Sequence, residues 1–372
     1  MSAHILVACS PGELRVAAVQ GGALIDYALW RPGCPDGLGD LYRGRVVARV
    51  PAMAGAFVAL PGAEGFLPDS EGADALSDGM AVAVRITRSA QGGKGPRLTA
   101  RVADADRALA GAGPPALLAR GPGAVERLAA LHPLAPIQVD DPGVVAALRP
   151  LLGERLAIGP VLDDELAGWI DALADSSVEL PGGMRASIHP TPALVAIDVD
   201  TGGASADRRP KRAAQLAANR AMLPALARQI RLRNLSGAIV VDVAGLALRH
   251  RTALTPDFLA ALAADPARPQ FLGFSALGLA EIMRPRAHPP LHELLAGPHA
   301  AGLSALRAVM QAAAAEPAAV FRLRAAPDVA AALADDPVAL PDLARRTGRT
   351  LIVASDPSLP PGHTAIERTA RD

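Results

Sequence analysis

The sequence predicts an α/β protein of several domains, and three observations point to that fold class. Two apolar strands, at residues 193–200 and 237–243, are joined by one long basic helix at about 210–234. Short alternating strands, separated by glycine and proline, follow one another from residue 40 to residue 103. After residue 298, helical and strand patterns alternate again. A chain of 372 residues is long enough for two to four domains with substantial cores.

The first 103 residues carry the alternation that predicts β-strands. Residues up to about Trp30 alternate and turn at Gly21-Gly22, which is typical of a β-hairpin. The short strands between residues 37 and 103 predict a small closed barrel. Residues 104–185 are rich in alanine and leucine, and we expect them to be mostly helical.

Aspartates stand at the ends of the two central strands. Asp198 and Asp200 close the first strand, and Asp242 closes the second. A strand, a helix and a strand of this length form a right-handed crossover, so the two strands should be parallel neighbours. Open parallel sheets place their chemistry at the carboxyl ends of the strands. We therefore expect Asp198 and Asp242 to lie close together.

This expected pair of aspartates has two interpretations. Two buried carboxylates repel each other, and a bound divalent cation is the simplest relief. Such a cation can polarise a phosphate or activate a water molecule. The alternative is that aspartates end strands because they favour turns and helix caps. The spacing alone leaves both interpretations open.

Positive charge is unevenly placed, although Lys+Arg and Asp+Glu both total 37 and the net charge is zero. The central helix carries Arg231 and Arg233, which could hold the phosphates of RNA near a metal. A solvated charged face is the usual alternative. The chain has two lysines, and one of them, Lys94, lies in a glycine-rich loop at residues 92–95.

The expected barrel contains two phenylalanines, Phe57 and Phe66, that could bind bases. Exposed aromatic side chains on a barrel of this kind stack on bases with little regard to sequence. The alternative is that both side chains belong to the core of the barrel.

The remaining composition narrows the class of protein. Two cysteines, Cys9 and Cys34, are too few for a disulfide framework or a cysteine-rich zinc site. No apolar run reaches the roughly 18 residues that span a bilayer. Residues 1–7 are too short and uncharged to be a secretory signal. We therefore expect a soluble, cytoplasmic protein.

Taken together, these segments resemble the ribonuclease E/G family, in the order in which that family carries them. The stretches that carry the resemblance are residues 39–46 with 56–58 and 65–68, residues 94–95 with 98–99, residues 196–200, and residues 219–242. The tail at 356–363 is similar to the C-terminal module of the G-type members.

The resemblance implies a more detailed layout of the α/β fold. It implies an OB-type RNA-binding barrel at 37–103, inserted in a shortened RNase H-like subdomain made of residues 1–36 and 104–185. A deoxyribonuclease-I-like catalytic α/β subdomain at 186–300 and a small C-terminal α/β module at 301–372 would follow.

The family's activity implies a magnesium-dependent endoribonuclease that cleaves single-stranded RNA in rRNA processing or mRNA turnover. The metal-binding and catalytic aspartates of the family fall on Asp198 and Asp242, and a nearby family asparagine falls on Asp200. The expected RNA-binding residues are Phe57, Phe66 and Lys94, with Arg231 and Arg233 as further phosphate contacts.

The chain also departs from the family's pattern. No Arg-Thr loop for sensing a 5′-monophosphate occurs between the barrel and the catalytic strands. Residues 297–300 read Gly-Pro-His-Ala where the family has a Cys-Pro-x-Cys zinc link, so a homo-oligomer would not be zinc-linked. Ala221 replaces a usual glutamate, Gly245 stands in place of a second acid, and Leu60 replaces a frequent aromatic residue.

Two other classes of function stay open at this stage. The lost acids would fit an RNA-binding protein without nuclease activity, although the two aspartates argue against that interpretation. A small-molecule phosphohydrolase would make the barrel irrelevant, and it would have no affinity for RNA.

Overall fold

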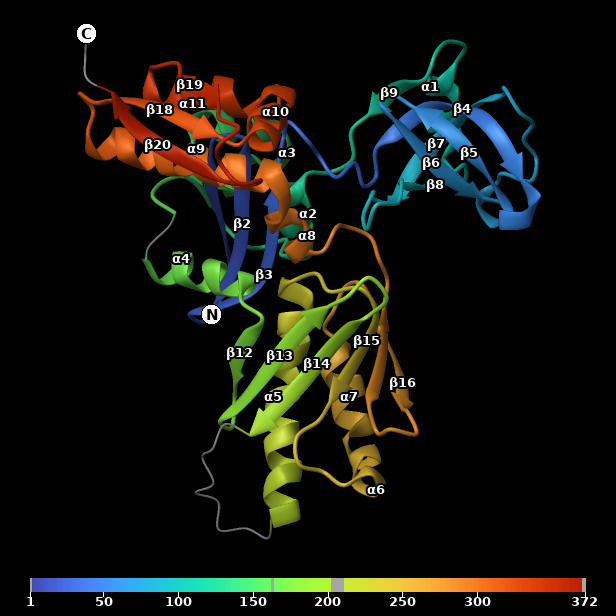
Figure 1. Ribbon diagram of the computed structural model, residues 1–372. Coiled ribbons are helices and arrows are strands. Elements are labelled where there is room, and N and C mark those ends of the chain that lie inside the picture. Colours follow the sequence, from blue (N-terminus) through green and yellow to red (C-terminus); the bar gives the residue numbers. More distant parts are fainter. Residues whose placement is uncertain (1, 162–163, 202–210, 370–372) are drawn as a thin grey trace. The chain divides into compact units, whose positions relative to one another are not determined.

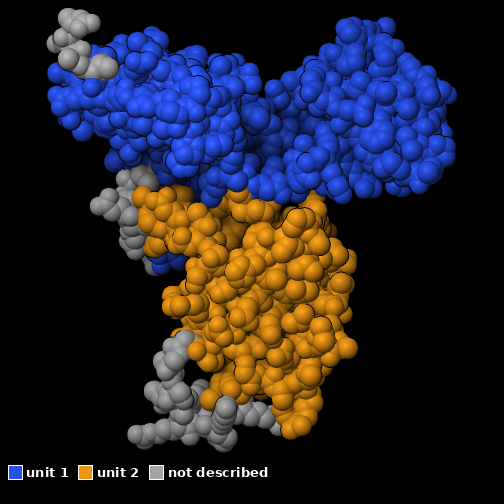
Figure 2. Space-filling model, in the orientation of Figure 1, with its two compact units in different colours: residues 1–162, 287–289, 293–372 blue, residues 163–286, 290–292 orange. Residues whose placement is uncertain are grey.

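The computed structural model describes residues 2–161, 164–201 and 211–369 (Figure 1). The chain forms two compact units (Figure 2). Unit 1 contains Met1–Leu162, Ala287–Pro289 and Glu293–Asp372, and unit 2 contains Asp163–Arg286 and Pro290–His292. Several sheets, helices and a closed barrel confirm the predicted α/β multidomain fold in its coarse form. Among the described residues, no helix is long and apolar enough to cross a membrane.

The first sheet of unit 1 has five strands in the order β11-β10-β1-β2-β3. Its strands are β1 (His4–Ser10), β2 (Glu13–Gln20), β3 (Ala23–Trp30), β10 (Ile137–Val139) and β11 (Leu156–Ile158). The predicted hairpin is thus extended to an antiparallel meander, while β10 and β11 add in parallel on the other side of β1.

The expectation that residues 104–185 are mostly helical is corrected by the structure. The helices there are α1 (Asp104–Ala110), α2 (Ala124–Leu131), α3 (Pro142–Leu152) and α4 (Asp164–Asp171). Four strands lie among them, namely β9 (Ala116–Ala119), β10, β11 and β12 (Ser177–Leu180). These strands are three or four residues long, which is too short for alternation to distinguish a strand from a helix.

The predicted barrel is present and closed. Its strands are β4 (Leu41–Val50), β5 (Gly55–Leu60), β6 (Ala63–Pro68), β7 (Ala81–Arg88) and β8 (Arg97–Thr99). They pair around the ring in the order β4-β5-β6-β8-β7, β7 pairs again with β4, and β9 adds to β4 outside the ring. The interior is filled by buried apolar side chains, among them Val46, Val58, Leu67, Val84 and Leu98.

The C-terminal part of unit 1 has its own sheet, in the order β19-β18-β20. It contains α9 (Gly297–Ala315), β18 (Val320–Ala325), α10 (Pro327–Asp335), α11 (Ala339–Thr347), β19 (Ile352–Ser355) and β20 (Thr364–Thr369). A separate apolar cluster lies between the helices and the sheet, with Leu306, Leu323 and Leu333 at its centre. The predicted helix–strand pattern after residue 298 is therefore confirmed, with α11 and β20 in addition.

Unit 2 is built on a six-stranded sheet, in the order β12-β13-β14-β15-β17-β16. Its further elements are β13 (Met184–Pro190), β14 (Val195–Thr201), α5 (Lys211–Leu232), β15 (Gly237–Asp242), α6 (Leu248–Arg251), α7 (Thr255–Leu262), β16 (Gln270–Phe274) and β17 (Ala280–Arg284). A short helix, α8 (Leu291–Leu295), follows. Helices α5 and α7 pack against the same apolar cluster on one face of the sheet (Figure 1).

A buried ion pair joins the last residue of β17 to the turn that follows α7. Arg284 and Asp265 are each only 5% exposed, and Arg284 Nε donates to Asp265 Oδ2 over 2.7 Å. The same guanidinium donates to Asn234 Oδ1 and to the Leu235 carbonyl. Because its partners satisfy it on several sides, removing one of them would leave a buried charge without compensation.

We expect Asp265→Ala to destabilise unit 2 by about 3–5 kcal/mol, because it strands the buried Arg284. The matched control is Asp257→Ala, which removes an aspartate that pairs with the half-exposed Arg220 and should cost about 0–1 kcal/mol. Chemical unfolding followed by circular dichroism measures both. Equal losses in the two variants would contradict the structural role of the buried pair.

Candidate active site

The predicted pairing of the two aspartate-bearing strands is confirmed. Strands β14 and β15 are parallel neighbours, and Asp198 is the register partner of Asp242. Neighbouring strands lie about 4.8 Å apart, so the two residues are adjacent at the carboxyl end of the pair. The crossover through α5 makes this arrangement, since a helix between two strands returns the chain to the same end of the sheet.

Both aspartates lie on the face of the sheet that is opposite α5. Val195, Ile197 and Val199 alternate with them and are buried against the helix. Asp198 is exposed, and the side chain of Asp242 is 48% exposed. The expectation of two buried carboxylates is therefore wrong, because the pleat turns them away from the core.

Asp200 lies on the same face as Asp198, two residues further along β14. Its register partner on β13 is Arg185, which forms an exposed ion pair with Glu179. Among the described residues, no three His, Cys, Asp or Glu side chains are grouped so that they could hold a metal ion. The role of Asp200 as a third ligand stays a prediction.

Arg251 holds Asp242 in place, and the sequence interpretation missed it. Its Nη1 donates to Asp242 Oδ1 over 2.6 Å and to the Gly278 carbonyl over 2.9 Å. Its Nε donates to the Leu246 carbonyl over 3.0 Å. Gly278 has φ +82°, and a Cβ there would lie 3.1 Å from Arg251 Cδ, so glycine leaves room for the arginine.

The first half of α5 supports the turn after β15. Asn219 is fully buried, and its Nδ2 donates to the carbonyls of Gln215 and Ala244. Gly245 follows with φ +66°, and a Cβ there would lie 2.4 Å from Gln215 Nε2. Asn219 thus holds the backbone beyond Asp242, and a side chain at Gly245 would require the end of the Gln215 side chain to move.

Arg231 and Arg233 lie at the opposite end of the sheet from the aspartates. Helix α5 ends at Leu232 and β15 begins at Gly237, so five residues of strand separate its start from Asp242. At about 3.3 Å per residue this is roughly 16 Å. The two arginines are therefore too far from the aspartate pair for the predicted phosphate contact beside a metal.

The local contacts of these arginines agree with that geometry. Arg233 is 6% exposed and donates to the carbonyls of Asp175 over 2.6 Å and Ala172 over 3.2 Å. Burial lowers the pKa of its guanidinium. Arg231 Nη1 points to the Ala264 carbonyl over 3.4 Å. Both side chains stabilise unit 2 by binding backbone carbonyls.

The electrostatics at Asp198 favour a cation. Partial burial, and then the negative charges of Asp200 and Asp242, raise the pKa of Asp198, while His189 lowers it. A divalent cation relieves this repulsion, and carboxylate oxygens are the ligands that Mg²⁺ takes in proteins. Mg²⁺ commonly keeps several waters and uses one or two carboxylates, so this pair fits such an ion.

In unit 1, Phe57 and Phe66 form a pair on the outer surface of the barrel. They are register partners on β5 and β6, and their rings meet edge to face with centroids 5.6 Å apart. Their neighbours Val58 and Leu67 point into the barrel, whereas neither ring belongs to its core cluster. Both rings are half-buried, so the interpretation as core residues does not hold.

Lys94 ends a tight turn between β7 and β8. Gln91 and Lys94 exchange two backbone hydrogen bonds of 3.1 Å, and Gly92 and Gly93 between them have φ +58° and +69°. Two successive residues with positive φ are typical of a type I′ hairpin, which explains the glycines. Lys94 is exposed at this turn.

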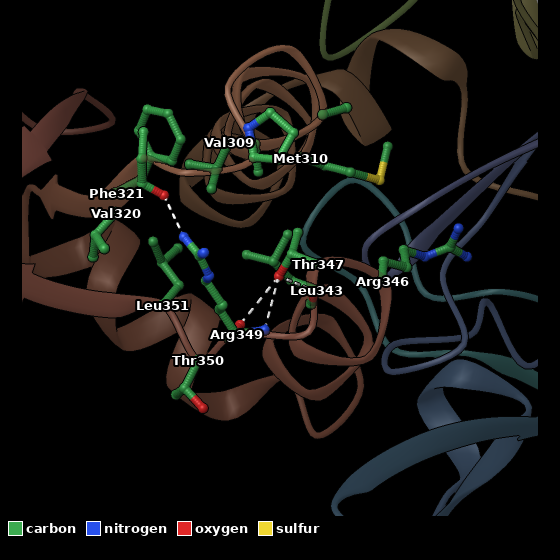
Figure 3. A pocket seen from close by; sticks show the side chains of 14 residues that line it. Val309, Met310, Val320, Phe321, Leu343, Arg346, Thr347, Arg349, Thr350 and Leu351 are labelled. Atoms are coloured by element: carbon green, nitrogen blue, oxygen red, sulfur yellow. Dashed lines mark hydrogen bonds between the residues drawn. The ribbon is translucent and has the colours of Figure 1, made fainter.

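A cavity of about 310 Å³ lies elsewhere, in the C-terminal part of unit 1 (Figure 3). Its lining is mainly apolar and includes Val309, Phe321 and Leu351. Arg349 crosses one side and donates to the Ala319 carbonyl, while Arg346 points away from the cavity. It contains none of the predicted site residues, so we do not assign the candidate chemistry to it.

The segment that carries both aspartates is similar to known proteins. Residues 163–287 match the model of the Ribonuclease E/G family. The chain is 39% identical to Ribonuclease E of Nostoc sp. over 118 residues, which are 32% of this chain and 17% of that protein.

Two relatives from Escherichia coli extend this picture. Ribonuclease E is 26% identical to this chain over an alignment of 400 residues. That alignment covers 79% of this chain and 38% of the relative. Ribonuclease G is 32% identical over 138 residues, which are 37% of this chain and 28% of the relative. The chain therefore spans less than half the length of these curated relatives.

The pKa of Asp198 provides a test of the carboxylate cluster. Asp200→Asn should lower this pKa because it removes the stronger negative neighbour, and Asp242→Asn should lower it less. His189→Gln should raise it, since a positive neighbour is lost. The carboxyl ¹³C resonance of Asp198, titrated with pH in metal-free protein, measures all three. An unchanged pKa in Asp200→Asn would show that these carboxylates do not interact.

Proposed function

Because the chain belongs to the ribonuclease E/G family through residues 163–287, we propose that it is a magnesium-dependent endoribonuclease acting on single-stranded RNA. The observation that carries the proposal is the register pairing of Asp198 with Asp242 inside the matched segment. Messenger RNA or precursor rRNA in the cytoplasm is the proposed substrate.

Asp198 and Asp242 are the residues that would hold the magnesium ion. The bound ion would stabilise charge that develops at the phosphorus and lower the pKa of a bound water. Arg251 keeps one oxygen of Asp242 occupied and so orients the carboxylate as a ligand. Asn219 donates to the Ala244 carbonyl and keeps the following turn in place, so that Asp242 retains its direction.

The barrel would bind the RNA strand. Phe57 and Phe66 offer two rings on the outer surface for stacking with a base, and Lys94 adds a charge at the neighbouring turn. Fixing the strand in this way would determine which phosphodiester meets the metal.

The finer fold assignment belongs to the same proposal. We assign the sheet β11-β10-β1-β2-β3 to an RNase H-like subdomain and the unit 2 sheet to a deoxyribonuclease-I-like one. A homo-oligomer, if formed, would lack the zinc link, since residues 297–300 contain no cysteine.

A second candidate is an RNA-binding protein without nuclease activity. It is favoured by the ion pair between Arg251 and Asp242, which already neutralises one of the two aspartates. Under this alternative, RNA binding would not need magnesium and the aspartates could be replaced without effect.

Cleavage of a labelled single-stranded RNA tests the proposed chemistry. Asp198→Asn and Asp242→Asn should each lower kcat roughly 100-fold or more, because the metal supplies several kcal/mol of charge stabilisation. EDTA should abolish cleavage and excess Mg²⁺ should restore it. Asp257→Asn, an aspartate paired with Arg220 on the α5 side of the sheet, is the control and should keep its activity.

Two results would count against the nuclease. Cleavage that persists in the double aspartate variant would come from other residues or from a contaminating enzyme. Binding of RNA without cleavage in the unchanged protein would favour the non-catalytic alternative.

The aromatic pair predicts a separate effect on affinity. Phe66→Leu and Phe57→Leu should each weaken RNA binding in EDTA by about 1–3 kcal/mol, which is the usual contribution of a stacked base. Phe66→Tyr keeps an aromatic face and should bind nearly as well as the unchanged protein. Fluorescence anisotropy measures these affinities, and equal binding by the leucine and tyrosine variants would contradict stacking.

A further inference from the structure

A row of side chains crosses the outer surface of the barrel and continues past the aromatic pair. Phe57 on β5 is the register partner of Phe66 on β6, and Phe66 is the register partner of Arg97 on β8. Register partners point to the same face of a sheet, and neighbouring strands are about 4.8 Å apart. Arg97 and Phe66 are therefore neighbours on adjacent strands.

The burial pattern places Arg97 outside the barrel. Pro96 and Leu98 on either side of it are buried, and Leu98 belongs to the core. Arg97 itself is exposed. An RNA that stacks a base on the Phe57–Phe66 pair would thus meet the Arg97 guanidinium on β8, the next β-strand of the same surface.

Arginines on β4, the first strand of the barrel, are bound to carbonyls or acids. Arg43 donates to the carbonyls of Pro114 and Ala110, and Arg45 donates to that of Gly79. Arg49 pairs with Asp69. Within the described part of the chain, by contrast, no hydrogen bond or ion pair is made by the Arg97 guanidinium.

A second cation follows Arg97 in the row. Arg88 on β7 is its register partner, so two guanidinium groups start from directly opposed positions. The row of register partners that begins at the aromatic pair therefore continues through two arginine positions.

A glycine on β5 leaves room for the Phe66 ring. A Cβ at Gly55 would lie 2.5 Å from Phe66 Cζ, so the ring lies over the backbone of β5. Because Phe66 and Arg97 are register partners, the sheet sets the spacing of their backbones. An aromatic ring and a cation on neighbouring strands suit a nucleotide, which carries its base and its phosphate close together.

We propose that Arg97 binds an RNA phosphate next to the base held by Phe57 and Phe66, which extends the RNA-binding surface along β8. This inference rests on the proposed RNA-binding function. It names Arg97 as a residue that contributes a salt-dependent contact in addition to Lys94, and it requires no metal.

The experiment compares salt dependence in the full chain. Binding of a fluorescent single-stranded dodecamer in EDTA is measured by anisotropy from low to physiological salt. Each phosphate contact on a single strand contributes about 0.7 to the slope of log affinity against log salt concentration. Arg97→Gln should therefore lower the slope by about 0.7 and weaken binding severalfold at low salt.

Two variants serve as controls. Arg322→Gln removes an exposed arginine from β18, in a different sheet, and should leave the slope unchanged. Arg97→Lys keeps the charge and should retain most of the slope. A slope in Arg97→Gln equal to that in Arg322→Gln would overturn the inference, as would an equal loss in Arg97→Lys.

The outcome for Arg97 is distinguishable from the outcome for the proposed function. If the unchanged protein binds RNA and Phe66→Leu weakens that binding, the proposed RNA-binding function is supported regardless of the result for Arg97→Gln. If the unchanged protein has no affinity for the dodecamer at low salt, the proposed function and the inference both fail.

Discussion

The candidate site depends on the parallel pairing of β14 with β15. Helix α5 makes that pairing possible because it spans the sheet and returns the chain to the end from which β15 starts. Once the strands are parallel and in register, Asp198 and Asp242 become neighbours. The apolar residues that alternate with them bury one face against α5, and this burial turns the carboxylates to the other face.

Arginine accounts for nearly all the cations of this chain, and the structure uses many of them as internal donors. Arg233, Arg251 and Arg284 each donate to backbone carbonyls in turns or beyond the ends of helices. The planar guanidinium offers several donors in a fixed geometry, which lysine cannot do. Counting positive charge along the sequence therefore overstates the number of side chains that can meet RNA. Arg97 stands out because the described residues leave its guanidinium without a partner.

Sequence patterns located the long elements and missed the short ones. The barrel strands and the crossover were predictable because alternation extends over six to ten residues in β4, β5 and β14. Strands β10 and β11 have three residues each, and they join the sheet through β1, which lies far away in sequence. The direction of α5 could have excluded Arg231 and Arg233, since its last turn must lie near the start of β15.

The sequence by itself determined the two strands that end in aspartate, the barrel and the resemblance that gives them a function, because these follow from local periodicity and from the order of motifs. Only the tertiary structure decided which side chains stand beside them. Arg251 reaches Asp242 through a turn, and Arg97 reaches Phe66 across a single parallel bridge. Contacts of this kind depend on strand register and on the path of loops, which no local pattern of residues specifies.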